Sequence, residues 1–399
     1  MYRQCTRCVM DTSDPQITFD ADGHCNHCTQ AAKLLSELPT DKEKALSLLI
    51  ANIQGMGKDK PYDCIIGLSG GVDSSYLAYK AKDWNLRPLL VHVDSGWNTP
   101  ESENNVVRLA EYLNAPLVRE TADWEDMRDL QRAFLQSGVP NQDIPQDHLF
   151  FSVIYEQVRK HAIPCWLSGS NLAGESILPQ AWGYNAMDSW HLREIHRKFG
   201  TRNLSSFKFM SLLDYLGYYC GFDESLQRFS PLNLLDYNPL EARETLKRDC
   251  GWQDYGRKHG ESYFTRYFQN YYLPKRFGYD KRKAHLSSLI MSGAITRDQA
   301  IEELQRPLYV PEDLEKDETI VREKLGYSKA QWECILNLPT HPHEDYPSRH
   351  ALITRISATS GIKRMFLVAL FLLLRGDFST LSKKISHKWR RRPLAGEGL

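Results

Sequence analysis

The chain has 399 residues, of which 42% are hydrophobic and 25% are charged, a composition typical of a folded protein with two or three domains. Lysine and arginine together number 50, as do aspartate and glutamate, and this balance argues against a broad basic surface for nucleic acid. The N-terminus lacks the apolar core of a signal peptide, so we expect a cytoplasmic protein.

Two pairs of cysteines lie near the start of the chain. Cys5 and Cys8 form one Cys-x-x-Cys pair, and Cys25 and Cys28 form the other. Each pair offers two thiolates from a tight turn, and four thiolates complete a tetrahedral zinc shell with no position left for a substrate. The spacing predicts a structural zinc ribbon over residues 1–34, with unmetallated thiols as the alternative.

A helical linker over residues 35–60 leads to a candidate phosphate-binding loop. The apolar run Tyr62–Leu68 predicts a buried strand, after which small residues turn the chain into a helix that begins at Asp73. Unpaired N–H groups converge at such a helix N-terminus, and adjacent glycines let a phosphate approach them. A turn that only closes a sheet is the alternative. The predicted loop residues are Ser69, Gly70, Gly71, Val72, Asp73, Ser74 and Ser75.

The Ser-Gly-Gly-x-Asp-Ser sequence of this loop resembles the PP-loop of ATP pyrophosphatases. Members of that family cleave ATP between the α and β phosphates and pass AMP to a substrate oxygen. The resemblance implies that ATP is a substrate and that Mg²⁺ accompanies it.

Strands and helices alternate after the loop. Apolar runs predict strands over residues 88–93, near residue 117 and over 164–168, and helical patterns separate them. This order predicts a doubly wound parallel α/β sheet over residues 61–190, of the PP-loop, adenine nucleotide alpha hydrolase-like type. Ligands bind beyond the carboxyl ends of the strands in such sheets.

Two further strand ends therefore contribute candidate nucleotide-binding residues. The second strand ends in Val93, Asp94 and Ser95, which the PP-loop resemblance assigns to the adenine and ribose. The fourth strand is followed by Gly169 and Asn171.

A hard cation such as Mg²⁺ prefers carboxylate oxygens as ligands. Asp73 in the loop and Glu175 beyond the fourth strand are the candidate ligands. For Glu175, an acid that only stabilises a helix N-terminus is the alternative.

Helical patterns dominate the rest of the chain, and we expect a substrate or partner domain over 191–340 and a helix with a basic tail over 341–399. Several cations lie on predicted loops of this region, where they could stabilise the departing pyrophosphate. Lys258, Lys281 and Arg282 are candidate catalytic residues, and Lys275 is a candidate nucleotide-binding residue. A solvated helix face is the alternative for each of them.

The run Met365–Leu374 is apolar but about half as long as a membrane span, so it predicts a buried helix. The basic tail after it could contact a membrane surface, although we do not predict such contact.

Taken together, these motifs resemble the N-acetyl sugar amidotransferase family of bacterial LPS O-antigen and surface-glycan biosynthesis. The similarity includes residues 5–11, the second cysteine pair, the PP-loop, Trp182-Gly183-Tyr184, residues 251–259 and residues 277–282. It implies an enzyme that adenylates the N-acetyl carbonyl oxygen of a sugar or nucleotide sugar and replaces it with ammonia, giving an acetamidino sugar. The ammonia would come from separate glutaminase and cyclase-like subunits.

Glutaminase chemistry within the chain itself finds no support in the sequence. Position 2 is Tyr2, whereas an N-terminal-nucleophile glutaminase needs cysteine there, and the cysteines outside the ribbon are isolated.

Two other functions remain open. A tRNA 2-thiolation enzyme also joins a zinc ribbon to a PP-loop, but it needs further catalytic cysteines and, for tRNA, a basic surface. A non-enzymatic scaffold for glycan assembly is the other alternative.

Overall fold

A parallel sheet forms the centre of the protein. The computed structural model describes residues 2–223, 226–255 and 260–375. Five strands within these residues are hydrogen-bonded in the order β3-β2-β1-β4-β5, and every neighbouring pair is parallel. The strands are β1 (Cys64–Gly67), β2 (Pro88–Asp94), β3 (Leu117–Thr121), β4 (Cys165–Leu167) and β5 (Gln227–Phe229). The parallel α/β sheet expected from the sequence is confirmed.

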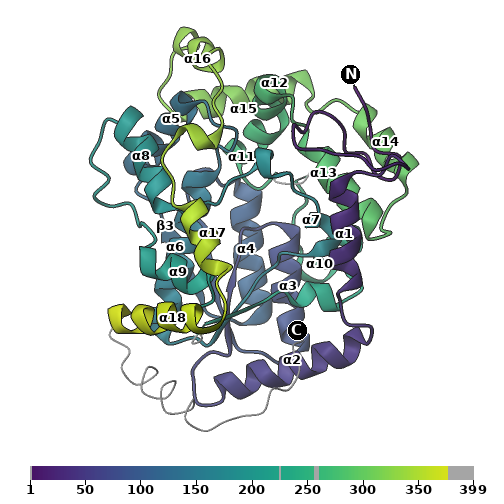
Figure 1. The fold of residues 1–399 in the computed structure, drawn as a ribbon, viewed down its shortest axis with the longest axis vertical. Coiled ribbons are helices and arrows are strands. Elements are labelled where there is room, and N and C mark those ends of the chain that lie inside the picture. The colour runs from purple at the N-terminus through teal and green to yellow at the C-terminus, as the bar shows by residue number, and fades with distance from the viewer. Residues whose placement is uncertain (1, 224–225, 256–259, 376–399) are drawn as a thin grey trace.

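Helices cover both faces of the sheet, as the ribbon in Figure 1 shows. Successive strand residues point to opposite faces, so Ile65 packs into one layer of helices and Ile66 into the other. The layer around Ile65 contains α5 (Trp124–Ser137), α6 (Ile144–His161) and α8 (Ser189–Phe199). The layer around Ile66 contains α2 (Lys42–Gly57), α3 (Val72–Asp83), α4 (Pro100–Leu113) and α10 (Pro239–Cys250).

Local sequence explains the ends of these helices. Thr99 caps α4 by accepting a hydrogen bond from the N–H of Ser102, and Pro100 stands at a first-turn position that needs no N–H donor. Helix α5 ends at Gly138, whose φ of +67° suits glycine.

The sheet continues past residue 190, after which the sequence analysis expected no strand. β5 pairs with β4, with Gln227 opposite Cys165 and Phe229 opposite Leu167. The strand is only three residues long and two of them, Gln227 and Arg228, are exposed, so no apolar run marks it. The expected domain boundary at residue 190 consequently falls within the part of the chain that builds the sheet.

The remaining helices lie before, between and after these elements. They are α1 (Asn26–Ser36), α7 (Leu172–Glu175), η1 (Gln180–Trp182), α9 (Leu212–Tyr219), η2 (Pro231–Leu234), α11 (Tyr263–Tyr267), η3 (Phe268–Tyr272), α12 (Leu273–Phe277), α13 (Lys281–Met291), α14 (Arg297–Gln305), α15 (Pro311–Lys324), α16 (Lys329–Leu336), η4 (His343–Asp345), α17 (His350–Ser357) and α18 (Gly361–Arg375). The aromatic residues of α11 and η3 pack with Val321 of α15 and Trp332 of α16 and are core residues, as expected.

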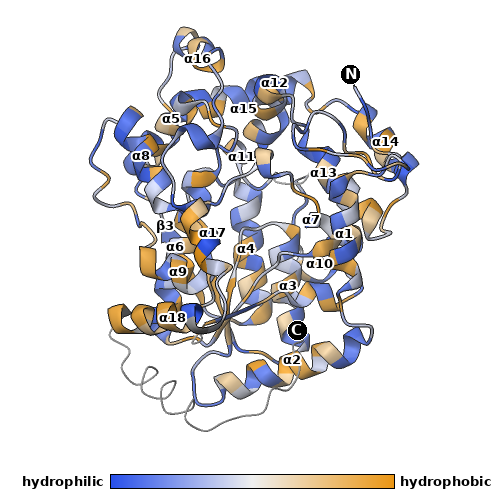
Figure 2. Ribbon diagram, viewed as in Figure 1, coloured by the Kyte–Doolittle hydropathy of each residue, from blue (hydrophilic) through white to orange (hydrophobic). Residues whose placement is uncertain are grey.

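The apolar run at the C-terminus forms most of α18, and the prediction that this helix is buried is wrong. Phe371 is 3% exposed, but Phe366 is 69% and Leu374 64% exposed, because only one side of the helix meets the protein. The helix is largely orange in the hydropathy view of Figure 2. Among the helices that the structure describes, none is long and apolar enough to cross a membrane. The basic tail lies beyond the described residues.

Candidate active site

The candidate phosphate loop joins β1 to α3. Gly70 has a φ of +84°, and a Cβ there would lie 2.8 Å from the carbonyl oxygen of Ser102, so the position requires glycine. Gly71 is the N-cap of α3 and brings no side chain to cap the helix. Ser69 Oγ accepts a hydrogen bond from the N–H of Gly71 at 3.2 Å and lies 3.2 Å from Ser74 Oγ. The loop thus presents an uncapped helix N-terminus, which is a site for a phosphate.

A cavity of about 2260 Å³ lies beyond the carboxyl ends of the strands, where the strand order reverses between β1 and β4. The predicted site residues that line it are Ser69, Gly71, Val72, Asp73, Ser74, Val93, Ser95, Gly169, Asn171, Glu175, Lys281 and Arg282. Gly70, Ser75 and Asp94 are not part of this lining. Lys258 is outside the described residues. The structure therefore brings together the loop, two further strand ends and the start of α13.

The end of β4 packs directly on the phosphate loop. A Cβ on Gly169 would lie 3.0 Å from the backbone nitrogen of Ser74 and 3.1 Å from the carbonyl carbon of Asp73. This close approach fixes the start of α3 against the central strands.

Two carboxylates and a tyrosine lie at the mouth of the loop. The hydroxyl of Tyr237 donates a hydrogen bond to Asp73 Oδ1. Burial, the charge of Asp73 and, more weakly, the charge of Glu175 raise the pKa of Tyr237. Both carboxylates are thus near one phenol and both line the cavity, an arrangement of hard oxygen ligands that suits Mg²⁺. Tyr237 was missed in the sequence because it lies far along the chain, in the segment before α10.

Residues 252–255 and 260–262, which we call the roof, lie over the phosphate loop. Trp252 Nε1 donates to the carbonyl of Gly70 at 3.2 Å, and the N–H of Thr99 donates to the carbonyl of Glu261 at 2.9 Å. An isolated bridge joins Asn98 to Ser262. The roof closes the cavity on the side of β2 and places a second acid, Glu261, at the loop. Sequence reasoning gave Trp252 no role in the site, although it belongs to a family motif.

His92 supports the loop from below. Its Nδ1–H donates to the carbonyl of Leu68 at 2.7 Å, and its Nε2 lies 2.8 Å from Glu103 Oε1. The hydrogen bond with His92 lowers the pKa of Glu103 to about 2, despite the opposing effect of burial. The contact between the buried His92 and Glu103 fixes the end of β1, and nothing in the sequence spacing of the two residues indicated it.

Lys275, Lys281 and Arg282 lie on helices rather than on loops. Asp280 caps α13 and places Lys281 and Arg282 in its first turn, and Lys275 lies on α12. Arg282 bonds both carboxylate oxygens of Asp280 and the carbonyls of α14 residues, so its guanidinium is held in place there. Lys275 on α12 donates to Tyr271 Oη at 2.7 Å and does not line the cavity, so the structure does not bring it to the phosphate loop.

The four ribbon cysteines form one buried cluster. The Sγ atoms of Cys5 and Cys28 lie 3.8 Å apart, those of Cys8 and Cys25 lie 3.5 Å apart, and all four fall within 4.8 Å of one another. A tetrahedral zinc ion with Zn–S bonds of about 2.3 Å needs sulfur atoms about 3.8 Å apart. The N–H of Cys25 donates to Cys5 Sγ at 3.2 Å. The cluster fits a structural zinc ion that its four thiolates would hold.

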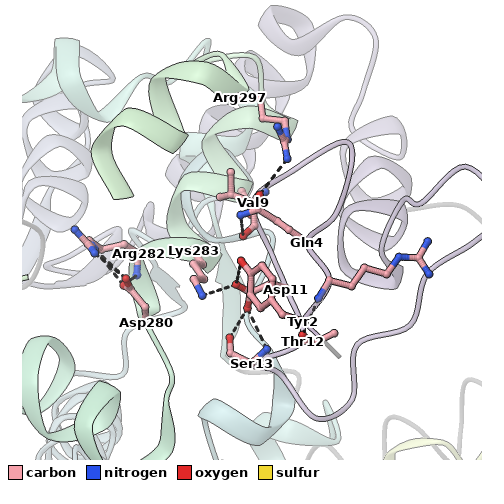
Figure 3. Close-up of polar contacts among 12 residues, drawn as sticks. Tyr2, Gln4, Val9, Asp11, Thr12, Ser13, Asp280, Arg282, Lys283 and Arg297 are labelled. Carbon is pink, nitrogen blue, oxygen red and sulfur yellow. Dashed lines mark hydrogen bonds and ion pairs between the residues drawn. The ribbon is translucent and has the colours of Figure 1, made fainter. Parts of the chain in front are cut away.

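The ribbon packs on α13, as Figure 3 shows. Lys283 forms an ion pair with the buried carboxylate of Asp11. The N–H of Val9 donates to Ser287 Oγ at 3.2 Å, and Arg297 donates to the carbonyl of Cys8 at 3.1 Å. These contacts hold the helix whose first turn brings Lys281 to the cavity.

No cysteine is among the described residues that line the cavity. Burial raises the pKa of Cys165 to about 12 and that of Cys220 to about 11. These thiols are therefore protonated at neutral pH and do not act as nucleophiles.

Comparison with protein families gives one match. Residues 261–359 match the family described as LPS biosynthesis protein WbpG-like, C-terminal domain. The segment starts in the roof at Glu261 and extends past α17. The match agrees with the resemblance to surface-glycan enzymes found in the sequence. No curated protein matches the chain.

Two of the solved structures that match this chain illustrate the similarity. NMN synthetase from Francisella tularensis has 13% identity and a TM-score of 0.30, covering 75% of this chain and 98% of its own. NH3-dependent NAD synthetase from Campylobacter jejuni subsp. jejuni NCTC 11168, in complex with the nitrate ion, has 14% identity and a TM-score of 0.29, covering 53% and 94%. Because both TM-scores are low, the fold is described from the order and pairing of its own strands.

Proposed function

We propose that this protein is an ATP-dependent sugar amidotransferase. The proposal starts from a segment similar to an LPS-biosynthesis domain that lies beside a phosphate loop resembling that of ATP pyrophosphatases. The protein adenylates the N-acetyl carbonyl oxygen of a sugar or nucleotide sugar and replaces that oxygen with ammonia. The product is an acetamidino sugar for bacterial surface polysaccharide.

One observation carries this proposal. The matched segment begins at Glu261, and the backbone of Glu261 and Ser262 pairs with Thr99 and Asn98 in the connection between β2 and α4. A Cβ on Gly71 would lie 3.4 Å from Glu261 Oε1. The part of the chain that carries the glycan-biosynthesis signature therefore shares a cavity with the part that would bind ATP.

The phosphate loop and the start of α3 form one side of the cavity, here called the α3 wall, which supplies the adenylation chemistry. N–H groups at the start of α3 bind the pyrophosphate, and the dipole of the helix stabilises its charge. The amide oxygen attacks the α phosphorus, and the bond to the pyrophosphate oxygen breaks with its electron pair. Asp73 and Glu175 would hold Mg²⁺, which neutralises phosphate charge when bound. Lys281 adds a positive charge from the other side of the cavity.

Adenylation explains how an amide exchanges oxygen for nitrogen. AMP leaves the amide carbon far more readily than hydroxide does, so ammonia can displace it. The same loop also serves sulfur transfer in other enzymes, but that chemistry uses a reactive cysteine, and the described cavity lining contains none. The structure thus favours ammonia over sulfur as the nucleophile.

We further propose that separate glutaminase and cyclase-like subunits supply the ammonia. Cys334, the exposed cysteine on α16, does not line the cavity. Free ammonium at high concentration should replace the partner proteins.

The decisive experiment incubates the purified protein with ATP, ammonium chloride and a panel of UDP-linked N-acetyl sugars. We expect pyrophosphate and AMP release that depends on the sugar, and a product whose mass shows oxygen replaced by NH. A scaffold would give no pyrophosphate, and a thiolation enzyme would give no amidine. Turnover with glutamine in place of ammonium, without partners, would contradict the separate glutaminase.

A further inference from the structure

The first turn of α6 faces the phosphate loop across the ends of the central strands. Helix α6 packs on the sheet face opposite α3. A Cβ on Gly67, the last residue of β1, would lie 2.3 Å from Phe150 Cζ, and Ser95 Oγ donates to Gln146 Oε1 at 2.9 Å. Residues 146–150 therefore lie against the ends of β1 and β2, in the wall of the cavity opposite the loop.

Asp147 differs from the acid one turn before it. Asp143 is buried, and its carboxylate accepts hydrogen bonds from Thr265 at 3.0 Å and Gln146 at 3.1 Å. Asp147 lines the cavity, its side chain is exposed to it, and no side chain in the described part of the chain hydrogen-bonds or ion-pairs with it. Asp143 is thus a structural acid, whereas Asp147 is available to a ligand.

The surroundings of Asp147 favour proton transfer near neutral pH. Enclosure by the walls of the cavity and the charge of Asp143 raise the pKa of Asp147 to about 7, and the charge of Lys281 from α13 opposes this rise. A general base works best when its pKa lies near the working pH, because it is then ionised and still basic enough to take a proton.

We propose that Asp147 accepts the proton that ammonia must lose when it attacks the adenylated amide. This inference rests on the proposed function. It assigns the nucleophile to the side of the cavity formed by the first turn of α6, here called the α6 wall, as ATP is assigned to the α3 wall. The nitrogen of ammonia carries a positive charge after the attack and must lose a proton before AMP leaves, so a proton acceptor in the α6 wall has a defined task.

The step balances as follows. The nitrogen lone pair forms a bond to the amide carbon, giving a tetrahedral centre with a positively charged nitrogen. One N–H proton passes to the carboxylate of Asp147. The bond from carbon to the AMP oxygen then breaks, its electron pair leaves with AMP, and the amidine remains as its cation. Asp147 returns the proton to solvent or AMP.

The test compares Asp147→Asn with Asp298→Asn, which changes an exposed acid in the first turn of α14, outside the cavity. With a UDP-linked N-acetyl sugar that the wild type converts, ATP and ammonium chloride, we expect Asp147→Asn to release pyrophosphate in a first turnover at close to the normal rate. Amidine formation should fall by at least ~10²-fold, the usual contribution of a general base. Asp298→Asn should behave as the wild type.

A pH profile separates proton transfer from a structural role. At constant free ammonia, amidine formation by the wild type should fall as the pH drops below about 7, because Asp147 becomes protonated. Asp147→Asn should lose this dependence, and Asp147→Glu should restore it in part. Asp147→Asn that forms amidine at the normal rate would overturn the inference alone. Wild-type protein that forms no amidine with any sugar would overturn the proposed function, and this inference with it.

Discussion

The two walls of the cavity act by different means. The α3 wall offers backbone N–H groups, shaped by Gly70 and Gly71, whose positions depend on the path of the chain. The opposite wall, built from α6 and α13, offers the side chains of Asp147 and Lys281. The first wall is therefore sensitive to any added Cβ, and the second to the charge of single side chains and to how their helices are held.

Each wall also has its own support. Gly169 at the end of β4 packs against the start of α3. The zinc ribbon holds α13 through Asp11, Lys283 and Val9. Damage to one support should affect one wall first, and substitutions can test this separation.

The largest effect should come from loss of the ribbon. In Cys5→Ser, three thiolates remain, and zinc binding of the order of 10 kcal/mol is weakened, a value comparable to the whole stability of a domain. We expect zinc content and folded yield to fall together, measured by metal analysis and thermal denaturation. Cys334→Ser, which changes an exposed thiol, should alter neither. A stable Cys5→Ser protein with a full zinc content would refute the ribbon.

Next in size is the catalytic effect of Asp73→Asn on the α3 wall. Removing the charge beside the phosphates should lower pyrophosphate release by ~10³-fold, with zinc content and melting temperature unchanged. Asp83→Asn, at the far end of the same helix, is the matched control and should keep normal activity. Turnover retained in Asp73→Asn would remove that residue from the site.

Two lysines on one turn of α13 should separate catalysis from support. Lys281→Met should lower pyrophosphate release by ~10²-fold without loss of stability, because Lys281 faces the cavity. Lys283→Met leaves the buried carboxylate of Asp11 without its ion pair and should cost about 2 kcal/mol of unfolding free energy. Rates per folded molecule and urea denaturation distinguish the two. Equal effects of both variants would contradict the separation of roles.

The smallest effect concerns backbone position. In Gly169→Ala, the added Cβ pushes the start of α3 by a few tenths of an ångström, and we expect pyrophosphate release to fall ~10-fold. Gly55→Ala, inside α2 with open space around it, should leave the rate unchanged and add stability of about 0.5–1 kcal/mol. Normal turnover in Gly169→Ala would show that the α3 wall tolerates movement.

The parts of the site that the sequence predicted are those fixed by neighbouring residues. The phosphate loop is one continuous stretch after a buried strand, and the cysteine pairs set their own turns. For the same reason the central strands were predicted to within a few residues. The positions of Ser69, Asp73 and Glu175 in one cavity follow from the rule that parallel strands end at one edge.

The rest depends on contacts between distant segments. Tyr237 reaches Asp73, Glu261 reaches Thr99 at the start of α4, and Asp147 lies on a helix that the sequence presents as ordinary and amphipathic. Charge alone did not identify the partners of the predicted cations. Lys275 donates to Tyr271 and does not line the cavity, whereas Arg282 lines the cavity and also binds Asp280. Only tertiary packing shows which cation faces the cavity.

The short strand β5 limits how this protein can be divided into fragments. It covers the edge of β4, whose three residues are all buried, and in the chain it lies between the phosphate loop and the matched segment 261–359. A fragment that stopped at residue 190 would expose that edge to other copies of itself. A boundary at residue 190 would therefore separate β5 from the strand that it covers. Recombination among relatives would have to keep β4 and β5 together.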